Sequence, residues 1–409
     1  MQEKDVLLRR RILKNLYYSN SLSCAELSEK INRSLPVTAK LLNDLIREQN
    51  VVETGHAPST GGRKPAMYAI TPDVLYIVSV AMDQFVSRVA IMNMTNEYVT
   101  PVEKFELPLM DNPNALSVLI AKIGSVIENS GIPKTKIAGV GIGIPGFVDV
   151  KKGINYSFIP TKDKSITDTV FEKIGIPTFI DNDSSLIALA ELRFGAARGK
   201  KNVMVVNAGW GVGLGMILNG ELFRGTNGFA GEFSHIPLFL NGKLCHCGKK
   251  GCLETEASLL VVIEKAWEGL RAGQLSKLKA LPVEHSEEAS ETIINAAYEG
   301  DQFAIALLSE AGYKIGRGVA ILIHLMNPEI VLLSGRGSSA GKIWQAPIQQ
   351  AINEHCIPRL GAQTSVEIST LGYEAELIGA AVLVMENYEK QPLLKTDKAG
   401  RKLDYSLIN

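Results

Sequence analysis

Hydrophobic and polar positions divide this chain into two patterns that meet near residue 70. Before that point, apolar residues recur every three or four positions. In 6–18 they lie at residues 8, 12, 13 and 16, the spacing of a helix buried on one side. Beyond it, short apolar runs alternate with longer amphipathic segments. The chain is therefore predicted to join a small helical unit to a larger α/β unit.

Two more helices are predicted in the N-terminal unit. Ser23 and Glu26 form a capping box, a pattern that satisfies the free amides at a helix start, so the second helix should cover 25–31. Ser34 can cap a third helix that has Pro36 in its first turn. The residues expected on the buried face of this third helix are Thr38, Leu41, Leu42 and Leu45.

Three short helices, followed by possible strands at 51–52 and 67–70, are typical of a winged helix-turn-helix, whose third helix enters the major groove of DNA. The outer face of that helix carries Val37, Lys40, Asn43 and Arg47. Between the strands, two glycines and two cations form a loop that suits phosphate or minor-groove contact. The residues predicted to contact DNA are Leu35, Val37, Ala39, Lys40, Arg63 and Lys64.

Charge supports this interpretation of the N-terminal unit. The whole chain holds 43 basic and 43 acidic residues, but residues 1–70 hold 11 Lys and Arg against 7 Asp and Glu. This positive end is where a polyanion would bind. Two alternatives remain open, since the loop could be an interdomain linker and the three helices could be a protein-docking module.

The remaining chain is predicted to form two α/β lobes. Apolar runs that indicate strands lie at 75–82, 87–92, 137–144, 178–180, 203–207 and 330–333, and helical patterns lie at 115–129, 184–194 and 305–326. The strands fall into two groups with a cleft expected between them. The predicted units are 1–70, a first lobe at 71–190, a second lobe at 191–372, a helix at 373–388 that returns to the first lobe, and a tail at 389–409.

Composition narrows the class of protein. With 409 residues, 46% hydrophobic and 21% charged, the chain is too long for one ordinary domain and too apolar for disorder. No window reaches the roughly 18 apolar residues that span a bilayer, and no export signal is present. We therefore expect a cytoplasmic protein with no membrane partner. Its few cysteines favour a metal site over a disulfide framework.

Three of the five cysteines lie within eight residues, in Cys-His-Cys-Gly-Lys-Lys-Gly-Cys at 245–252. Zinc in structural sites takes four ligands of this type. The predicted ligands are His235, Cys245, Cys247 and Cys252, which form a closed shell and indicate structural Zn²⁺. His246 is a weaker candidate because adjacent side chains diverge. Reduced thiols without a metal are the alternative.

Two further motifs bear polar or flexible groups at strand ends. Asp181, Asn182 and Asp183 follow a strand, where carboxylate and amide groups suit bidentate hydrogen bonds to vicinal hydroxyls, although Asp183 could also be a general base or a helix cap. In 209–215, four glycines occupy alternate positions. They indicate either phosphate binding or close packing of a strand.

Together, Gly-Val-Gly-Ile-Gly-Ile-Pro-Gly at 139–146, the motif at 181–183, the glycines at 209–215, the segment 227–235 and the cysteine motif at 245–254 resemble the ROK family of repressors, open reading frames and sugar kinases. The N-terminal unit resembles its repressor branch, which includes repressors of N-acetylglucosamine, glucose and xylose genes. The resemblance implies an actin-like (ribonuclease H-like) pair of lobes around a sugar cleft. By motif position, the implied sugar-binding residues are Asn182, Asp183, Glu232, His235 and Glu254.

This sequence departs from the pattern of the family's kinases at both phosphate-binding turns. Their Asp-x-Gly-x-Thr reads here Ala81-Met82-Asp83-Gln84-Phe85, which removes the magnesium-ordering carboxylate and places a negative charge where a phosphate would approach. Trp210 stands where the kinases carry Thr. Losing both turns should abolish phosphoryl transfer, so the chain is expected not to be an enzyme and Asp183 to be a vestigial base.

The resemblance and these departures predict a sugar-responsive transcriptional repressor of genes for carbohydrate uptake or catabolism. Its expected partners are operator DNA, a sugar or sugar phosphate, and further copies of itself in a homodimer or homotetramer. The alternatives are a sugar kinase that has gained a DNA-binding domain, and a regulator whose effector is another protein.

Overall fold

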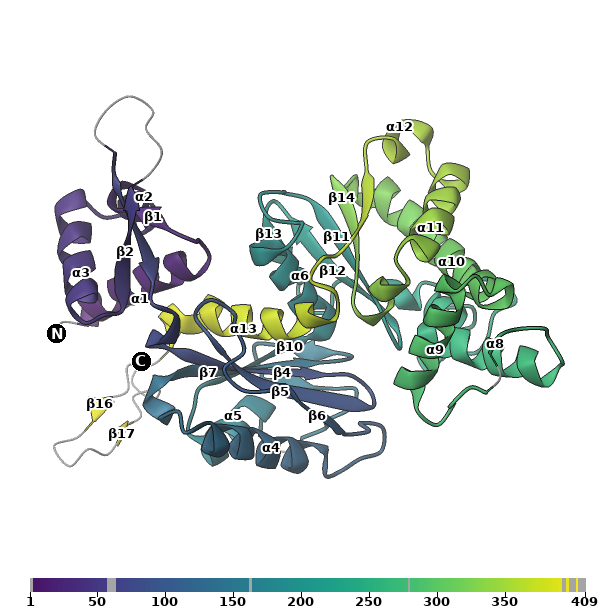
Figure 1. The fold of residues 1–409 in the computed structure, drawn as a ribbon, viewed down its shortest axis with the longest axis horizontal. Helices are drawn as coiled ribbons and strands as arrows, with labels where there is room; N and C mark the ends of the chain where they lie inside the picture. Colours follow the sequence, from purple (N-terminus) through teal and green to yellow (C-terminus); the bar gives the residue numbers. More distant parts are fainter. Residues whose placement is uncertain are drawn as a thin grey trace.

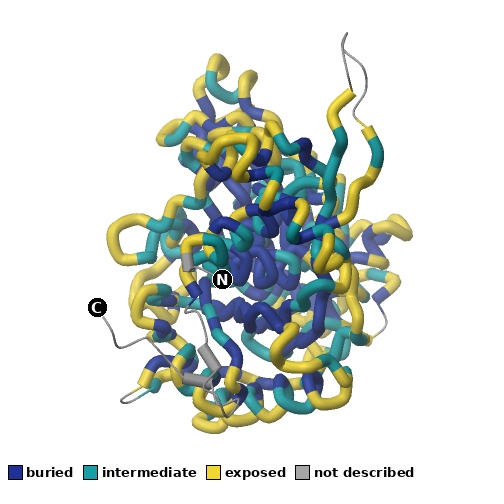
Figure 2. Tube along the Cα trace, turned by 90° about the vertical axis from the view of Figure 1, so that its left-hand side faces the viewer, coloured by how far each residue is buried: buried dark blue, intermediate teal, exposed yellow. Residues whose placement is uncertain are grey.

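The computed structural model describes residues 3–56, 64–161, 164–278 and 280–391 and the short strands Lys395–Thr396 (β16) and Lys402–Leu403 (β17), which pair with each other. Figure 1 shows a small N-terminal unit beside two larger lobes. Buried segments occupy the centre of the molecule and exposed loops its periphery (Figure 2). None of the described helices is long and apolar enough to cross a bilayer.

The N-terminal unit has the elements of a winged helix-turn-helix. They are α1 (Glu3–Tyr17), β1 (Leu22–Ser23), α2 (Cys24–Lys30), α3 (Leu35–Arg47), β2 (Val51–His56) and β3 (Ala66–Ile70). Both hydrogen bonds of the capping box at Ser23 are present. The four residues expected to face inward from α3 are buried. The short strand β1, which pairs with β3, was not anticipated, and the predicted contact residue Arg63 lies outside the described residues.

The first lobe contains a five-stranded sheet in the order β10-β7-β4-β5-β6. Strands β4, β5 and β6 form an antiparallel meander, to which β7 and β10 add in parallel. Helices α4 and α5 cover one face of this sheet (Figure 1). The elements are β4 (Tyr76–Met82), β5 (Val86–Asn93), β6 (Glu103–Glu106), α4 (Ala115–Ser130), β7 (Ile137–Ile144), β8 (Val148–Asp149), β9 (Ile154–Asn155), α5 (Ile166–Ile174) and β10 (Thr178–Asn182).

The second lobe repeats this topology. Its sheet has the order β13-β12-β11-β14-β15, again an antiparallel meander extended by two parallel strands. The repeat confirms the predicted pair of α/β lobes. The elements are β11 (Val203–Ala208), β12 (Val212–Leu218), β13 (Glu221–Phe223), α7 (Glu254–Ala257), α8 (Leu259–Arg271), α9 (Ser286–Tyr298), α10 (Gln302–Met326), β14 (Ile330–Ser334), α11 (Lys342–His355), α12 (Pro358–Gly361) and β15 (Ser365–Ile368).

Two helices form the layer between the sheets. Helix α13 (Ala375–Asn387) lies on β4 and β7 of the first lobe, and α6 (Asp183–Phe194) lies on β11 and β12 of the second. Glycines allow the close contacts: a Cβ at Gly379 would lie 2.0 Å from the Leu186 carbonyl oxygen, and one at Gly215 would lie 2.6 Å from the Ser184 carbonyl oxygen. The glycine-rich segment 209–215 is therefore a hairpin that packs closely under α6. The predicted lobe boundary at 190 falls inside this helix.

The N-terminal unit is docked on the rest of the chain through α1. Its apolar core is continuous with Met92 and Met94 of the first lobe and with Val384 and Met385 of α13. Arg11 pairs with Glu389 at 2.7 Å, and the Arg10 guanidinium donates to the carbonyl oxygen of Gln391 at 2.6 Å. The first residues of the predicted tail are therefore held against α1.

Candidate functional site

A cavity of about 160 Å³ lies between the lobes. Its walls come from the turn after β4, the junction of β10 with α6, the turn between β11 and β12, and the segment that leads to the cysteine cluster. All of the residues predicted to hold sugar hydroxyls line this one cavity, namely Asn182, Asp183, Glu232, His235 and Glu254.

The junction of β10 with α6 uses its polar side chains in different ways. Asn182 caps α6, because its Oδ1 accepts from the backbone amides of Ser184 and Ser185, and its amide donates to the carbonyl oxygen of Gly146 at 3.0 Å. Asp183 follows it into the cavity, where its carboxylate accepts a hydrogen bond from the Asn207 amide at 3.1 Å. Burial raises the pKa of Asp183 to about 6.

The first carboxylate of this motif has a different partner. Asp181 accepts two hydrogen bonds from the Arg224 guanidinium, at 3.0 and 2.6 Å. Burial raises the pKa of Asp181, while the charge of Arg224 opposes that shift. Asp181 thus joins the first lobe to the second through an ion pair.

Two more carboxylates face the cavity from the second lobe. Burial, together with the negative charges of Asp183 and Glu254, raises the pKa of Glu232 to about 7. The side chain of His235 lies between this pocket and the cysteines. Its Nε2 is 3.9 Å from Glu232 Oε2, and its Nδ1 is 3.6 Å from Cys245 Sγ.

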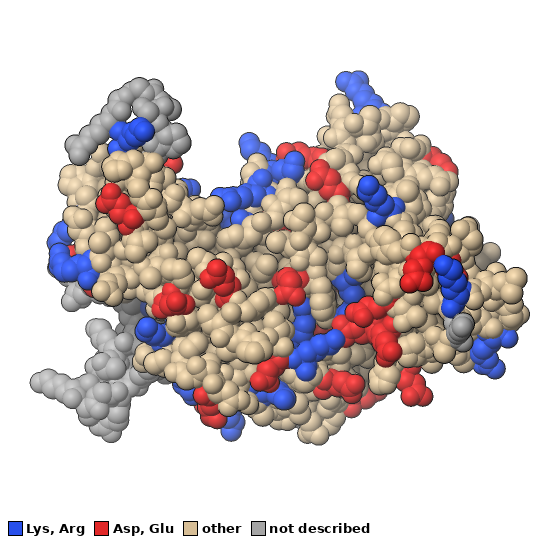
Figure 3. Space-filling model, in the orientation of Figure 1, with Lys and Arg blue, Asp and Glu red and all other residues tan. Residues whose placement is uncertain are grey.

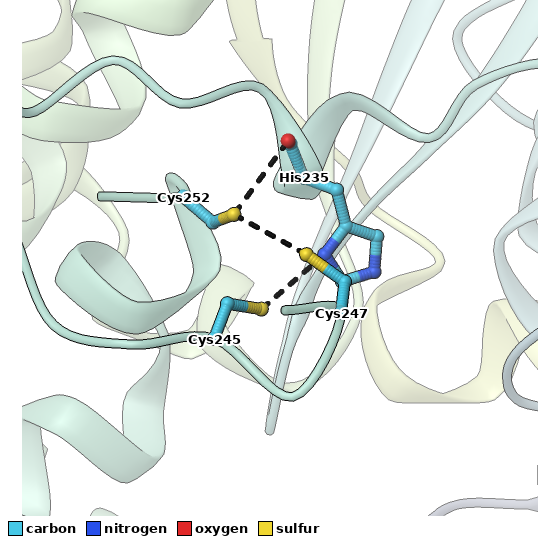
Figure 4. A group of neighbouring side chains, drawn as sticks. All are labelled: His235, Cys245, Cys247 and Cys252. Carbon is cyan, nitrogen blue, oxygen red and sulfur yellow. Dashed lines mark hydrogen bonds between the residues drawn. The ribbon is translucent and has the colours of Figure 1, made fainter. Parts of the chain in front are cut away.

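The side chains of His235, Cys245, Cys247 and Cys252 lie close together in the cysteine cluster (Figure 4). Cys247 Sγ lies 3.6 Å from Cys252 Sγ, too far for a disulfide, and the four ligand atoms of His235, Cys245, Cys247 and Cys252 lie within 4.8 Å of one another. Zinc bonds of about 2.3 Å to sulfur and 2.0 Å to nitrogen imply separations of roughly 3.5 to 3.8 Å between ligand atoms. These side chains could therefore hold a metal ion. The turn requires Gly248 and Gly251, which have φ of 86° and 74°.

A second set of possible ligands shares two members with the first. His235, Cys245, His246 and Glu254 also lie within 4.8 Å of one another. His246 is largely exposed, however, and its Nδ1 is 3.6 Å from Glu254 Oε1. The set with three thiols matches the donor preference of zinc more closely.

The turn after β4 is closed by its own acidic side chain. Asp83 Oδ1 accepts hydrogen bonds from the backbone amides of Phe85 and Val86, both at 2.8 Å. These are the kind of donors that a phosphate-binding turn offers to its ligand. Here the carboxylate already occupies them.

The corresponding turn of the second lobe meets this turn directly. The rings of Phe85 and Trp210 are 5.9 Å apart, edge to face. The Arg336 guanidinium lies over Trp210 at 4.6 Å and over Tyr373 at 4.3 Å, and the Arg88 guanidinium covers Tyr373 at 3.5 Å. This stack of Phe85, Trp210, Arg336, Tyr373 and Arg88, here called the interlobe stack, connects the two turns.

Comparison with known proteins identifies the family. A family model described as the ROK family matches residues 88–387. This chain belongs to the ROK family. The match covers the cysteine cluster and most of both lobes and of the cavity lining, and it confirms the resemblance found in the sequence.

Relatives within the ROK family carry two kinds of name. A glucokinase of Halalkalibacterium halodurans is 32% identical over 292 residues, 70% of this chain and 88% of its own. A xylose repressor of Caldicellulosiruptor bescii is 27% identical over 383 residues, 92% of this chain and 94% of its own. A solved ROK family transcriptional regulator, a homologue of the E. coli MLC protein, is 25% identical with a TM-score of 0.76, covering 94% of this chain and 97% of its own.

Several ROK cavity residues were missed by the sequence analysis. Asn207 was noted only as the last residue of a predicted strand, and Arg336, Tyr373 and Glu376 were not noted as site residues, although all four line the cavity. Each lies more than 100 residues from Asp83 along the chain or in another lobe. No local pattern in the sequence marks them as neighbours.

The cluster leads to a prediction about metal content. Freshly purified protein should contain about one divalent metal ion per chain, because three thiols and an imidazole complete a tetrahedral shell. Replacing both Cys247 and Cys252 by serine should lower this to a small fraction, as measured by mass spectrometry of the metals. Cys24→Ser, which changes a thiol of α2 outside the cluster, should keep full occupancy. Wild-type protein with far less than one ion per chain would contradict the assignment.

Proposed function

We propose that this chain is a sugar-responsive, DNA-binding transcriptional repressor of genes for carbohydrate uptake or catabolism, acting in the cytoplasm. The observation that carries the proposal is that one chain joins a winged helix-turn-helix to a cavity lined by hydroxyl-binding side chains. The share of this chain that aligns with its relatives supports a repressor. The xylose repressor aligns over 92% of the chain, whereas the glucokinase aligns over 70% of it.

DNA would be bound by helix α3 and the loop between β2 and β3. Leu35 and Val37 are 53% and 41% exposed, and Lys40 is also exposed on the same helix. Exposed apolar side chains on a helix suit contact with thymine methyl groups, and lysine suits phosphate. On the face in Figure 3, basic side chains lie at the edges of the N-terminal unit. A homodimer or homotetramer would place two such helices on a palindromic operator.

The sugar would be held by carboxylates from both lobes. Asp183 and Glu232 would accept hydrogen bonds from sugar hydroxyls. Glu254, the first residue of α7, would also accept one. Structural Zn²⁺ in the cysteine cluster would fix Glu254, which is two residues beyond Cys252, and His235, whose Nε2 faces Glu232. The metal thus shapes the pocket, and the protein's own side chains bind the ligand.

Helix α6 offers a direct connection between sugar and DNA sites. It begins at Asp183 in the cavity and ends at Phe194, whose ring is 5.4 Å from that of Tyr17 at the end of α1. The neighbouring Arg193 lies over the Tyr18 ring at 4.6 Å and pairs with Glu386 of α13. A shift of α6 on sugar binding would therefore move α1 and, with it, the spacing of paired α3 helices. A tenfold change in operator affinity requires only about 1.4 kcal/mol.

A sugar kinase is the second candidate, and the relative named glucokinase favours it. The two turns that would bind phosphate in a kinase argue against kinase activity in this chain. In this chain Ala81 stands in place of the magnesium-ordering carboxylate, Asp83 occupies the amides of its own turn, and Trp210 is buried in the interlobe stack. Phosphoryl transfer depends on positioned donors and a metal, so we assign Asp183 to ligand binding.

The first prediction of this proposed function concerns DNA contact. Lys40→Ala and Lys64→Ala should each weaken operator binding and lower the salt slope of log K by about 1, because each removes one phosphate contact. Lys136→Ala, on the exposed surface of the first lobe, should leave both quantities unchanged. The measurement is fluorescence anisotropy over a salt series, and unchanged binding in both N-terminal variants would reject this DNA interface.

The second prediction of this proposed function concerns the response of operator binding to a sugar. A panel of xylose, glucose and N-acetylhexosamines should contain a sugar that raises the melting temperature and weakens operator binding at least ~10-fold. Asp183→Ala should lose both effects. In the same samples, ATP and Mg²⁺ should yield no sugar phosphate. Turnover that Asp183→Ala abolishes would establish a kinase, and no response to any sugar would favour a protein effector.

A further inference from the structure

The charged side chains that line the cavity are mostly acidic. Five carboxylates line it, those of Asp83, Asp183, Glu232, Glu254 and Glu376. Among the described residues, Arg336 is the one arginine or lysine in its lining. Any anion in so small a space would lie near several of these carboxylates, whichever way it entered.

Arg336 is already paired with carboxylates of the protein. Its guanidinium bonds to Glu287 at 2.5 Å, to Asp83 Oδ2 at 3.1 Å and to the Tyr373 hydroxyl at 2.5 Å. The rings of Trp210 and Tyr373 lie against it, at 4.6 and 4.3 Å. A phosphate that approached this arginine would compete with two carboxylates that already pair with it.

Two sets of backbone donors near the cavity are occupied as well. The amides of Phe85 and Val86 bind Asp83, and the first amides of α6 bind Asn182. These two places, a tight turn and a helix N-terminus, are where proteins usually bind phosphate. In this chain each is filled by a side chain of the protein itself.

The polar atoms that remain unpartnered suit a neutral ligand. Trp210 Nε1 and Glu376 Oε1 are buried, and neither has a hydrogen bond partner within the described part of the chain. One is a donor and the other a carboxyl oxygen, and both residues line the cavity. A sugar hydroxyl can accept from the indole and donate to the carboxyl oxygen, whereas a phosphate dianion can only accept. Burial raises the pKa of Glu376 to about 8, with the charge of Arg88 opposing that shift and the charges of Asp183 and Asp83 adding to it.

We propose that this cavity selects an uncharged sugar and rejects its phosphate esters, and that Asp83 and Glu376 are the residues that set this specificity. Asp83 acts by filling the phosphate-binding turn and by its charge. Glu376 acts by offering a buried carboxyl where a phosphate would need a cation. The inference rests on the proposed function, since it concerns the ligand of the same cleft.

The experiment compares each sugar of the panel with its own phosphate monoester, using the full-length protein and calorimetry at about pH 8, where the ester is a dianion. Glucose is paired with glucose 6-phosphate and N-acetylglucosamine with its 6-phosphate. The uncharged member of the pair that binds should bind at least ~100-fold more tightly than its ester. In Asp83→Asn/Glu376→Gln, this ratio should fall at least ~10-fold. Glu128→Gln, which removes an exposed carboxylate of α4, should leave the ratio unchanged.

The outcomes separate the two proposals. An ester that binds as tightly as its sugar, or more tightly, overturns this specificity and leaves a sugar-responsive repressor standing. A ratio that the double variant does not change overturns the roles of Asp83 and Glu376. No binding by either member of any pair overturns the proposed sugar site and this inference together. Should the double variant not fold, the wild-type ratio still decides the specificity.

Discussion

The arrangement of this protein depends on one close-packed layer, in which α6 and α13 lie between the two sheets. Glycines at 141, 215 and 379 let backbone approach backbone there, so the helices cannot slide independently of the sheets. Each helix has one end at the cavity and the other at the N-terminal unit, through Asp183 and Phe194 for α6 and through Glu376 and Glu386 for α13. Interfaces packed this closely move between discrete arrangements, which is what a switch requires.

The interlobe stack explains how a kinase-like fold can serve regulation. Kinases of this fold need open turns for nucleotide. Here the corresponding turns meet through Phe85 and Trp210, and Arg336 lies over Trp210 and pairs with Asp83 of the first turn and with Glu287 of α9. In the proposed function, these contacts between the lobes stand where nucleotide would approach, and sugar binding in the cavity would change the lobe angle without ATP.

Much of the fold followed from local patterns. The sequence predicted the capping box at Ser23, the buried face of α3 and the apolar strands. In these segments, the spacing of apolar residues follows the period of a helix or a strand. For the glycine-rich start of β12, the sequence left strand packing and phosphate binding open, because glycines have no side chain that shows which face is buried. The residues predicted to bind a ligand in the cavity were found from sequence motifs. Arg336 and Glu376, in contrast, are brought to the cavity by tertiary packing. Their pairing with Asp83 and Arg88 spans more than 250 residues and has no local signature.

The central claim is that α6 carries the effect of the sugar to the DNA-binding unit. It is tested most directly by measuring operator affinity with and without saturating sugar in Phe194→Ala, beside wild-type protein. The account predicts that this variant still binds both sugar and operator but that sugar no longer changes operator affinity, because the contact with Tyr17 is lost. Undiminished release of operator by sugar in Phe194→Ala would contradict the account.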